Sequence, residues 1–188
     1  MLCPGRGGQT LGYFALVAYL PDPLARFLDD LRIELIPDCK PRAHVTILPP
    51  RPLYQDLKET VRQIADKSRG IPPFQIEIGT TAIFDTSNVV YLGLSRGSRE
   101  LYELYRTLNS GRLRYEEPFK YHPHITIAQN IDREEAERVA AVTKRRWSAW
   151  DGPREFLACE MTFVQNVAPD AWLDVAQLPL TADVPVAT

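Results

Sequence analysis

The sequence predicts an α+β protein made of one βαβαβ unit written twice, with two antiparallel-type sheets lining a central cleft and helices outside. The first observation is the pattern His-(Val/Ile)-Thr, which begins at position 44 and again at position 124, an offset of 80 residues. The second is that strand and helix patterns around the two copies recur at close to that offset. The third is a globular composition, 45% hydrophobic and 24% charged over 188 residues, enough for one sizeable core or two small lobes.

The first repeat is expected at approximately 13–87 and contains three strands and two helices. They are a strand at 13–20, a helix with its apolar stripe at 24–31, the His44 strand, a helix with its apolar side at 57–64, and a strand at 74–78. Asp22-Pro23 is expected to supply the N-cap and first-turn proline of the first helix. Pro49-Pro50 is expected to end the His44 strand.

The second repeat is expected at approximately 88–180, so that the chain forms a single two-lobed domain over 1–188. Its elements are a strand at 89–92, a helix with its stripe at 101–108 and its end marked by Gly111, the His124 strand, a helix opened by Asp132 and Glu135, and strands at 156–164 and 172–178. The tails 1–12 and 181–188 lack periodicity, and we expect them to be loosely held.

Charge and cysteine content narrow the class of protein. A net charge of −2 and a pI of 5.9 argue against general coating of DNA or RNA, which needs a broad cationic surface. The 3 cysteines are scattered without a metal-ligand spacing. No apolar run reaches the length of a membrane helix, and the apolar stretch 11–20 lacks the flanks of a signal peptide. We therefore expect a cytoplasmic monomer with no membrane partner.

The duplicated motif predicts acid–base chemistry. Because strand side chains alternate between faces, His44 and Thr46 share one face, and His124 and Thr126 share another, while the β-branched residues between them point into a core. If the two strands meet, two imidazoles and two hydroxyls surround one pocket. Such a set suits cleavage of a phosphodiester by general acid–base catalysis.

Two other uses of these residues are weaker. Two imidazoles make an incomplete zinc shell, and no Cys, Asp or Glu stands near them in a ligand pattern, so we expect no metal and no cofactor. A serine nucleophile is not supported, because the chain lacks a G-x-S-x-G elbow and its cysteines have no nucleophile-like context.

These residues resemble the two-histidine (2H) phosphoesterase superfamily, whose signature is a duplicated His-x-Thr/Ser. The resemblance runs from about Tyr13 to Leu180 and is greatest over the segment 121–128, Tyr-His-Pro-His-Ile-Thr-Ile-Ala. The superfamily includes RNA 2′,3′-cyclic phosphodiesterases and the proteins named 2′-5′ RNA ligases. The resemblance implies the same two-lobed fold. One departure is Gln129, where many relatives have arginine, and this departure puts a phosphate contact from that position in doubt.

By this resemblance His44 and His124 are the acid–base pair, and Thr46 and Thr126 bind the phosphate oxygens. The implied reaction is metal-independent hydrolysis of cyclic phosphodiesters, with 2′,3′-cyclic phosphates of RNA ends or nucleotides as substrates. Four alternatives stay open: reversible 2′-5′ RNA ligation, cleavage of 2′-5′ oligonucleotides, exonucleolytic trimming of RNA ends, and binding of a nucleotide or RNA end without turnover. Sequence does not say which histidine is the acid.

Supporting residues follow from position on the strands. Arg42 and His122 each precede a motif histidine by two residues and share its face, so both are candidate contacts for phosphate or base. Tyr121 and Phe14 are candidate stacking surfaces, although core packing is the commoner role of an aromatic on a strand. Lys40, Lys120 and Arg51 are candidates for a local cationic rim. The run 144–146, Lys-Arg-Arg, lies late in a helix and is placed outside the site.

Overall fold

The computed structural model describes residues 12–36, 42–168 and 171–182. Lys40, one of the candidate rim cations, and most of the two tails lie outside the described residues. The elements are β1 (Tyr13–Tyr19), α1 (Leu24–Leu35), β2 (His44–Pro52), α2 (Leu57–Ser68), β3 (Phe74–Ile83), β4 (Val90–Arg96), α3 (Ser98–Leu108), a 3₁₀ turn η1 (Gly111–Leu113), β5 (Ile125–Ala128), α4 (Arg133–Ala149), β6 (Glu155–Ala158), β7 (Glu160–Ala168) and β8 (Ala171–Pro179).

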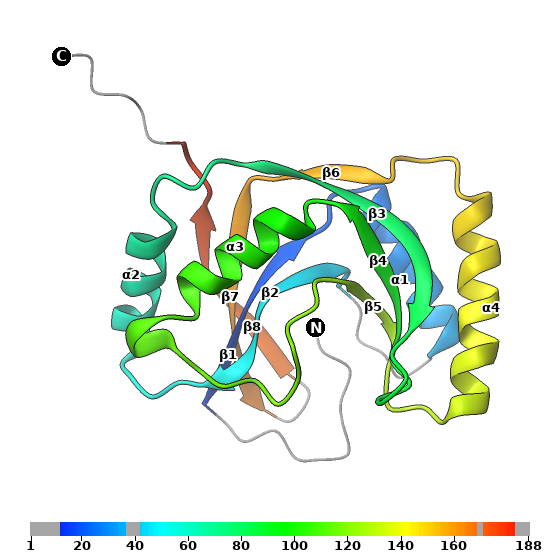
Figure 1. Cartoon of the computed structure of the whole chain (residues 1–188), viewed down its shortest axis with the longest axis horizontal. Helices are drawn as coiled ribbons and strands as arrows, with labels where there is room; N and C mark the ends of the chain where they lie inside the picture. The colour runs from blue at the N-terminus through cyan, green and yellow to red at the C-terminus, as the bar shows by residue number, and fades with distance from the viewer. Residues whose placement is uncertain (1–11, 37–41, 169–170, 183–188) are drawn as a thin grey trace.

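The strands form two four-stranded sheets, in the orders β2-β1-β7-β8 and β5-β4-β3-β6, and every pair within them is antiparallel. The helices flank these sheets (Figure 1). This arrangement confirms the expected α+β fold class with two antiparallel sheets. The two strands that carry or follow the motif histidines, β2 and β5, occupy the same position, the edge, in their respective sheets.

Strand membership crosses the two sequence repeats. The third strand of the first repeat, β3, pairs with β4 of the second repeat, whereas β7, from the second repeat, pairs with β1. The sheets therefore do not divide the chain at the expected repeat boundary near residue 87. Hydrophobic alternation identifies a strand and its buried face but carries no information about which strand lies beside it.

The prediction of a single strand over 156–164 was wrong. The structure breaks this stretch at Cys159, so that β6 pairs with β3 in one sheet and β7 pairs with β1 in the other. The carbonyl of Cys159 accepts a hydrogen bond from the Leu180 amide at 2.8 Å. Because the break is a single residue, the alternating pattern continues through it and gives no sign of the change of sheet.

Two proline boundaries also differ from expectation. β2 continues through Pro49-Pro50 to Pro52, which an edge strand tolerates because its outward N–H groups have no sheet partner to lose. The cap position of α1 is Pro23 rather than Asp22. The Asp22 carboxylate still accepts the Arg26 amide at 3.3 Å and so satisfies one first-turn N–H group.

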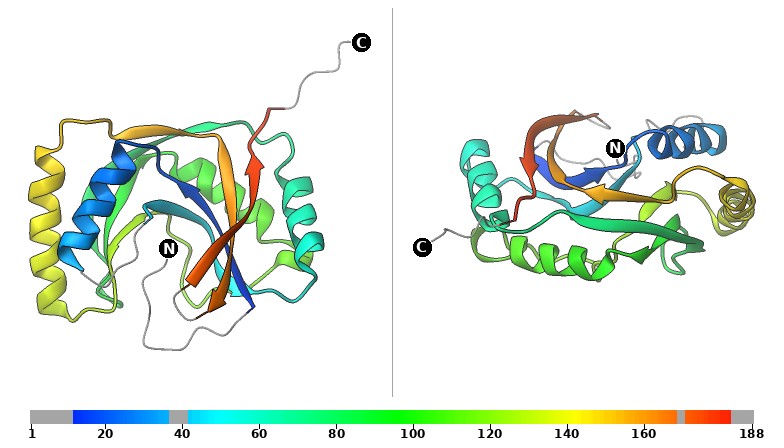
Figure 2. Two further views of the ribbon diagram at one scale, coloured as in Figure 1. Left: turned by 180° about the vertical axis from the view of Figure 1, so that it is seen from behind. Right: turned by 90° about the horizontal axis from the view of Figure 1, so that it is seen from above.

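The helices pair at the two ends of the molecule, α1 with α4 and α2 with α3 (Figure 2). At the first end Phe27 stacks on Trp150 with ring centroids 4.3 Å apart, and Arg146 binds Glu34 at 2.7 Å. The Asp132 carboxylate accepts the Glu135 amide at 2.8 Å, as the capping pattern predicts. Because α1 contacts β5 and α3 contacts β2, each repeat's first helix packs against the motif strand of the other repeat.

A buried arginine joins β2 to the segment after α3. Arg51 is 1% exposed, forms an ion pair with Glu117, and donates to the Asn109 side-chain oxygen at 2.8 Å and the Leu113 carbonyl at 3.2 Å. A guanidinium has a fixed fork of donors, so one side chain can hold several acceptors in place. Arg51 is therefore a structural residue and is not part of an exposed cationic rim.

Replacing this guanidinium is expected to cost much more than replacing an exposed one. We expect Arg51→Met to lower the free energy of unfolding by about 3 kcal/mol, because it leaves the Glu117 carboxylate and three backbone or amide oxygens without their buried donor. Urea denaturation measures this loss. The control is Arg62→Met, which breaks an exposed ion pair with Glu59 and should cost under about 1 kcal/mol. Equal losses in the two variants would contradict the structural role.

Candidate active site

The first motif lies at the start of β2. Val45 and Ile47 are buried in the core, and Thr46 between them is half-buried on the opposite face. His44 is 8% exposed, so its ring is largely enclosed by protein. The alternation expected from the sequence is confirmed here.

The second motif repeats this arrangement around β5. Ile125 and Ile127 are fully buried, whereas His124 and Thr126 are half-buried and line a cleft. β5 begins one residue after His124, so this imidazole projects from the strand entrance. The two motifs therefore present the same residue types from edge strands of the two sheets.

A tyrosine connects the two motifs. The Tyr121 hydroxyl donates a 2.9 Å hydrogen bond to the backbone carbonyl of Thr46, and β2 and β5 are in direct contact. The Tyr121 ring stacks on Tyr105 at 4.2 Å, with an interplanar angle of 5°, and meets Tyr102 edge-on at 5.4 Å. The approach to the second motif is therefore fixed against the backbone of the first.

The two motif histidines are held in the same way. Nδ1 of His44 lies 2.7 Å from the carbonyl oxygen of Arg42, and Nδ1 of His124 lies 2.6 Å from the carbonyl oxygen of His122. A carbonyl accepts but cannot donate, so each bond requires the proton on Nδ1 in the neutral ring. Nε2 is then the basic nitrogen of both rings, and the two imidazoles have matched tautomers.

The cleft has a volume of about 570 Å³. Its lining includes Thr46, His124, Thr126 and, from the segment before β5, Lys120 and His122. His44 is not among the lining side chains, but its charged form is disfavoured partly by the charge of His124, which indicates that the two rings interact. The structure thus gathers both threonines and His124 on the cleft surface, with His44 more deeply buried.

Aromatic rings surround the histidines, and sequence reasoning missed them. The Phe84 ring meets His124 edge-on at 5.1 Å and His122 at 5.3 Å, and Tyr91 stacks on Phe84 at 4.1 Å. On the other side, the Tyr19 ring lies edge-on to His44 at 6.2 Å. Phe84 lies directly after β3 and Tyr91 lies in β4, and no local pattern distinguishes them from core aromatics.

Burial sets the protonation of the histidines. Desolvation lowers the pKa of His44 well below its usual value of 6.5, and the charges of Arg32 and His124 lower it further. Desolvation also lowers the pKa of His124, against a smaller raising effect of its bond to the His122 carbonyl. Both rings are therefore neutral at neutral pH in the protein without substrate.

Arg42 does not line the cleft. Its guanidinium lies 3.5 Å from the centre of the Tyr19 ring and forms an ion pair with Asp174 of β8, which also accepts the Tyr19 hydroxyl at 2.8 Å. The exposed Arg42 side chain is thus held beside the first motif, and its own backbone carbonyl binds His44. The structure connects Arg42 to the site through this carbonyl.

The remaining candidates divide between the cleft and the core. His122 and Tyr121 line the cleft, although the Tyr121 ring and hydroxyl are taken up by the tyrosine stack and by Thr46. Phe14 is 3% exposed, stacks on Phe163 at 4.9 Å and does not line the cleft. Lys120 and Gln129 line the cleft.

Among the described residues, no group of three or more His, Cys, Asp or Glu side chains is placed to hold a metal ion. None of the helices in the described part of the chain has both the length and the apolar content needed to cross a membrane.

Two His-x-Thr edge strands facing one cleft of a two-sheet α+β fold are the arrangement expected of the two-histidine phosphoesterase class. The family model of the 2′-5′ RNA ligase superfamily matches residues 20–169. The chain belongs to this superfamily.

Relatives named as phosphoesterases match about half of the chain. The protein named "Putative phosphoesterase BH1439" of Halalkalibacterium halodurans is 30% identical over 94 residues, which cover 49% of this chain and 54% of that protein. A protein of Staphylococcus aureus strain Newman named "Putative phosphoesterase" is 29% identical over 100 residues, which cover 52% and 59% of the two chains. The chain thus spans little more than half the length of these curated relatives.

Solved structures match almost the whole chain. E. coli LigT complexed with phosphate has a TM-score of 0.63 at 18% identity, and LigT complexed with 3′-AMP has a TM-score of 0.62 at 18% identity; each match covers 92% of this chain and 99% of LigT. The protein TT0787 of Thermus thermophilus has a TM-score of 0.64 at 16% identity and is covered completely. At this identity these matches establish the fold.

The lowered pKa of His44 predicts a pH-dependent stability. At a pH between the unfolded-state pKa of about 6.5 and the lower folded-state pKa, the unfolded chain binds a proton that the folded protein excludes. The free energy of unfolding therefore decreases as the pH is lowered, by up to about 1.4 kcal/mol per pH unit. We expect His44→Gln to flatten the fall between about pH 7.5 and 5.5. Urea unfolding at several pH values measures this slope. The control is His122→Gln, which removes an exposed imidazole and should change the slope less.

Proposed function

We propose that this protein is a metal-independent phosphodiesterase that hydrolyses 2′,3′-cyclic phosphates of RNA ends or nucleotides. The observation that supports this most directly is the pair of equivalent histidines, each with Nδ1 held by the carbonyl two residues before it. A fixed tautomer gives each ring one nitrogen, Nε2, for proton transfer to or from a reacting group. His124 on the cleft surface and the more deeply buried His44, whose charge interacts with that of His124, together provide both an acid and a base.

The unequal burial of the two histidines supports an assignment of the two roles. A bound phosphodiester anion raises the pKa of nearby imidazoles, but repulsion between the two rings disfavours a proton on both. His44 is the more deeply enclosed and its pKa is lowered further, so the single proton resides on His124. His124 is then the acid that protonates the departing ribose oxygen, and His44 is the base that takes a proton from the attacking water.

The threonines stabilise the negative charge that develops on the nonbridging phosphate oxygens. Thr46 and Thr126 each stand two residues after a motif histidine and line the cleft. Their hydroxyls donate to the nonbridging oxygens as the five-coordinate transition state forms, when these oxygens carry the most charge. The buried Val45 and Ile125 fix the strands on which these hydroxyls sit.

The comparisons support a phosphate-binding cleft. LigT, which shares the fold, has structures complexed with phosphate and with 3′-AMP. Attack on the cyclic phosphate by an RNA 5′-hydroxyl in place of water, with departure of the 3′-oxygen, forms a 2′-5′ linkage, so 2′-5′ RNA ligation stays an alternative for this chain. Incubation with a panel of cyclic nucleotides and short RNAs, followed by identification of products, separates hydrolysis from ligation and from exonucleolytic trimming. Binding of a cyclic nucleotide without any product would leave only a binding role.

The proposed division of labour predicts different effects of the two histidine substitutions. On a 2′,3′-cyclic nucleotide, we expect His44→Ala and His124→Ala each to reduce kcat by about 10²- to 10⁴-fold. On a p-nitrophenyl phosphodiester, whose leaving group departs without protonation, His124→Ala should retain much more activity than His44→Ala. Steady-state kinetics on both substrates tests this. The opposite order would reverse the roles, and equal activity of both variants and the wild type on both substrates would end the proposal.

Substitutions that differ only in the hydroxyl test the threonines. We expect Thr46→Val and Thr126→Val, which keep the shape but lose the donor, to lower kcat about 10- to 100-fold with a smaller change in KM. Thr46→Ser and Thr126→Ser keep the donor and serve as matched controls with activity near the wild type. If the valine and serine variants behave alike, the hydroxyls do not contact the transition state.

A further inference from the structure

The segment between α3 and β5 forms one wall of the cleft and carries an unusual set of side chains. Cations and aromatic rings follow one another along it: Arg112, Arg114, Tyr115, Phe119 and Lys120. All are exposed except Tyr115, which is half-buried. A segment that contains both cations and aromatic rings provides both phosphate attraction and stacking faces, which are the two requirements for binding a single nucleic-acid strand.

The acids near this segment are mostly neutralised. Glu117 is paired with the buried Arg51, which leaves Glu116 as the exposed acid between positions 111 and 120. Glu59 on α2, whose charge interacts with Arg112, is itself paired with Arg62. The segment is therefore locally cationic on a protein whose formal net charge is −2.

Hydrogen bonds and an ion pair hold the part of the segment around Tyr115, although it contains little regular structure. The Tyr115 amide donates to the Asn109 side-chain oxygen at 2.8 Å, and the Asn109 amide group donates to the Tyr115 carbonyl at 3.1 Å. The buried Arg51 guanidinium donates to the same Asn109 oxygen and to the Leu113 carbonyl. A surface fixed before binding loses little conformational entropy when a ligand is bound.

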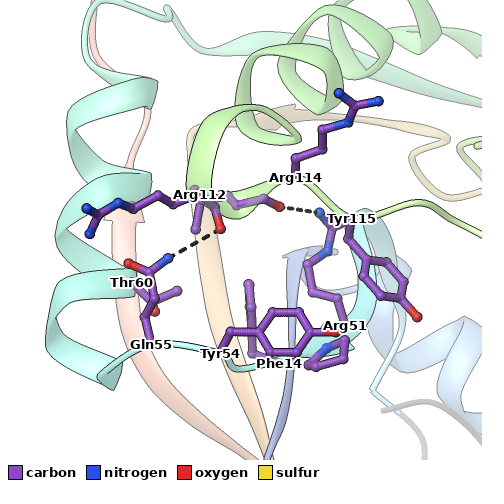
Figure 3. Close-up of a pocket in the computed structure, with 10 residues that line it drawn as sticks. Phe14, Arg51, Tyr54, Gln55, Thr60, Arg112, Arg114 and Tyr115 are labelled. Carbon is purple, nitrogen blue, oxygen red and sulfur yellow. Dashed lines mark hydrogen bonds between the residues drawn. The ribbon is translucent and has the colours of Figure 1, made fainter.

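Tyr115 makes this surface continuous with the cleft. It lines both the cleft and a small neighbouring hollow, which Tyr54, Arg112 and Arg114 also line. Tyr54 is 76% exposed. In Figure 3 the guanidinium groups of Arg112 and Arg114 extend outward in different directions, while the rings of Tyr54 and Tyr115 flank Arg51. We call Tyr54, Arg112, Arg114 and Tyr115 the basic aromatic surface.

We propose that the basic aromatic surface is a second binding site, which takes the nucleotides that precede the terminal 2′,3′-cyclic phosphate of a single-stranded RNA whose last nucleotide occupies the cleft. This inference rests on the proposed function in placing the terminal phosphate beside the motif histidines. A mononucleotide leaves this surface unused. An RNA chain gains phosphate contacts with the arginines and a stacking face on Tyr54.

The test compares an RNA strand with a mononucleotide in binding. The probes are a labelled single-stranded RNA bearing a 3′-phosphate, followed by fluorescence anisotropy, and a nucleoside 3′-monophosphate as competitor. We expect Arg112→Gln/Arg114→Gln to weaken RNA binding about ten-fold or more and to reduce the slope of log K against log salt by about 1.4, as for two lost phosphate contacts. Tyr54→Ala should weaken it about five-fold or more through lost stacking. Mononucleotide binding should stay within about two-fold.

The matched control is Lys144→Gln/Arg145→Gln, which removes two exposed cations from α4, at the other end of the molecule (Figure 1). It should bind RNA as the wild type does. RNA binding that is unchanged in the Arg112/Arg114 variant, or that falls equally in the control, overturns the inference.

Kinetics separate this inference from the proposed function. On an RNA ending in a 2′,3′-cyclic phosphate, kcat/KM should fall in the Arg112/Arg114 variant by the same factor as RNA binding, with kcat on a cyclic mononucleotide unchanged. If the wild type hydrolyses neither substrate but the binding differences appear, the surface is supported and the proposed function fails. If the wild type and the Arg112/Arg114 variant have the same kcat/KM as each other on the RNA and also on the mononucleotide, the proposed function stands and the surface proposal fails.

Discussion

The site depends on the meeting of two sheet edges, fixed by the hydrogen bond from the Tyr121 hydroxyl to the Thr46 carbonyl. Alternation within β2 and β5 decides which side chains face outward, but only this junction brings both outward faces to one cleft. Register is the second half of the constraint, since a slip of one residue would turn each histidine into the core and expose Val45 or Ile125. The buried Tyr121 ring, stacked on Tyr105, shields this hydrogen bond in part from solvent, which strengthens it.

Sequence predicted the parts of the fold that have a local periodicity. The four helices, the cap at Asp132 and the alternation around both His-x-Thr motifs were confirmed because each is encoded within a few neighbouring residues. The exchange of β3 and β7 between the sheets was not predictable in this way. A strand with one buried face satisfies the same pattern in either sheet, and the one-residue break at Cys159 leaves the period unchanged.

The candidate site shows the same division. The sequence brought attention to His44, His124 and their threonines because a duplicated motif is visible without coordinates. It could not separate an exposed cation from Arg51, whose guanidinium is enclosed by Asn109, Leu113 and Glu117 from a distant segment. Whether a charged side chain is solvated or neutralised depends on residues that are distant in the sequence and close in the folded chain. Contacts of the same kind place Phe84 against His124.

Duplication alone gives two groups with the same chemistry, whereas acid–base catalysis requires two groups that differ. The carbonyl bonds to Nδ1 are equivalent in the two motifs and therefore cannot create the difference. The difference in burial can create it. His44 is the first residue of β2 and lies among core residues beside Tyr19, whereas His124 lies on the cleft surface before β5 begins. The asymmetry that the proposed reaction needs thus comes from the packing around a symmetric pair, and one proton shared between unequal imidazoles suffices for both steps.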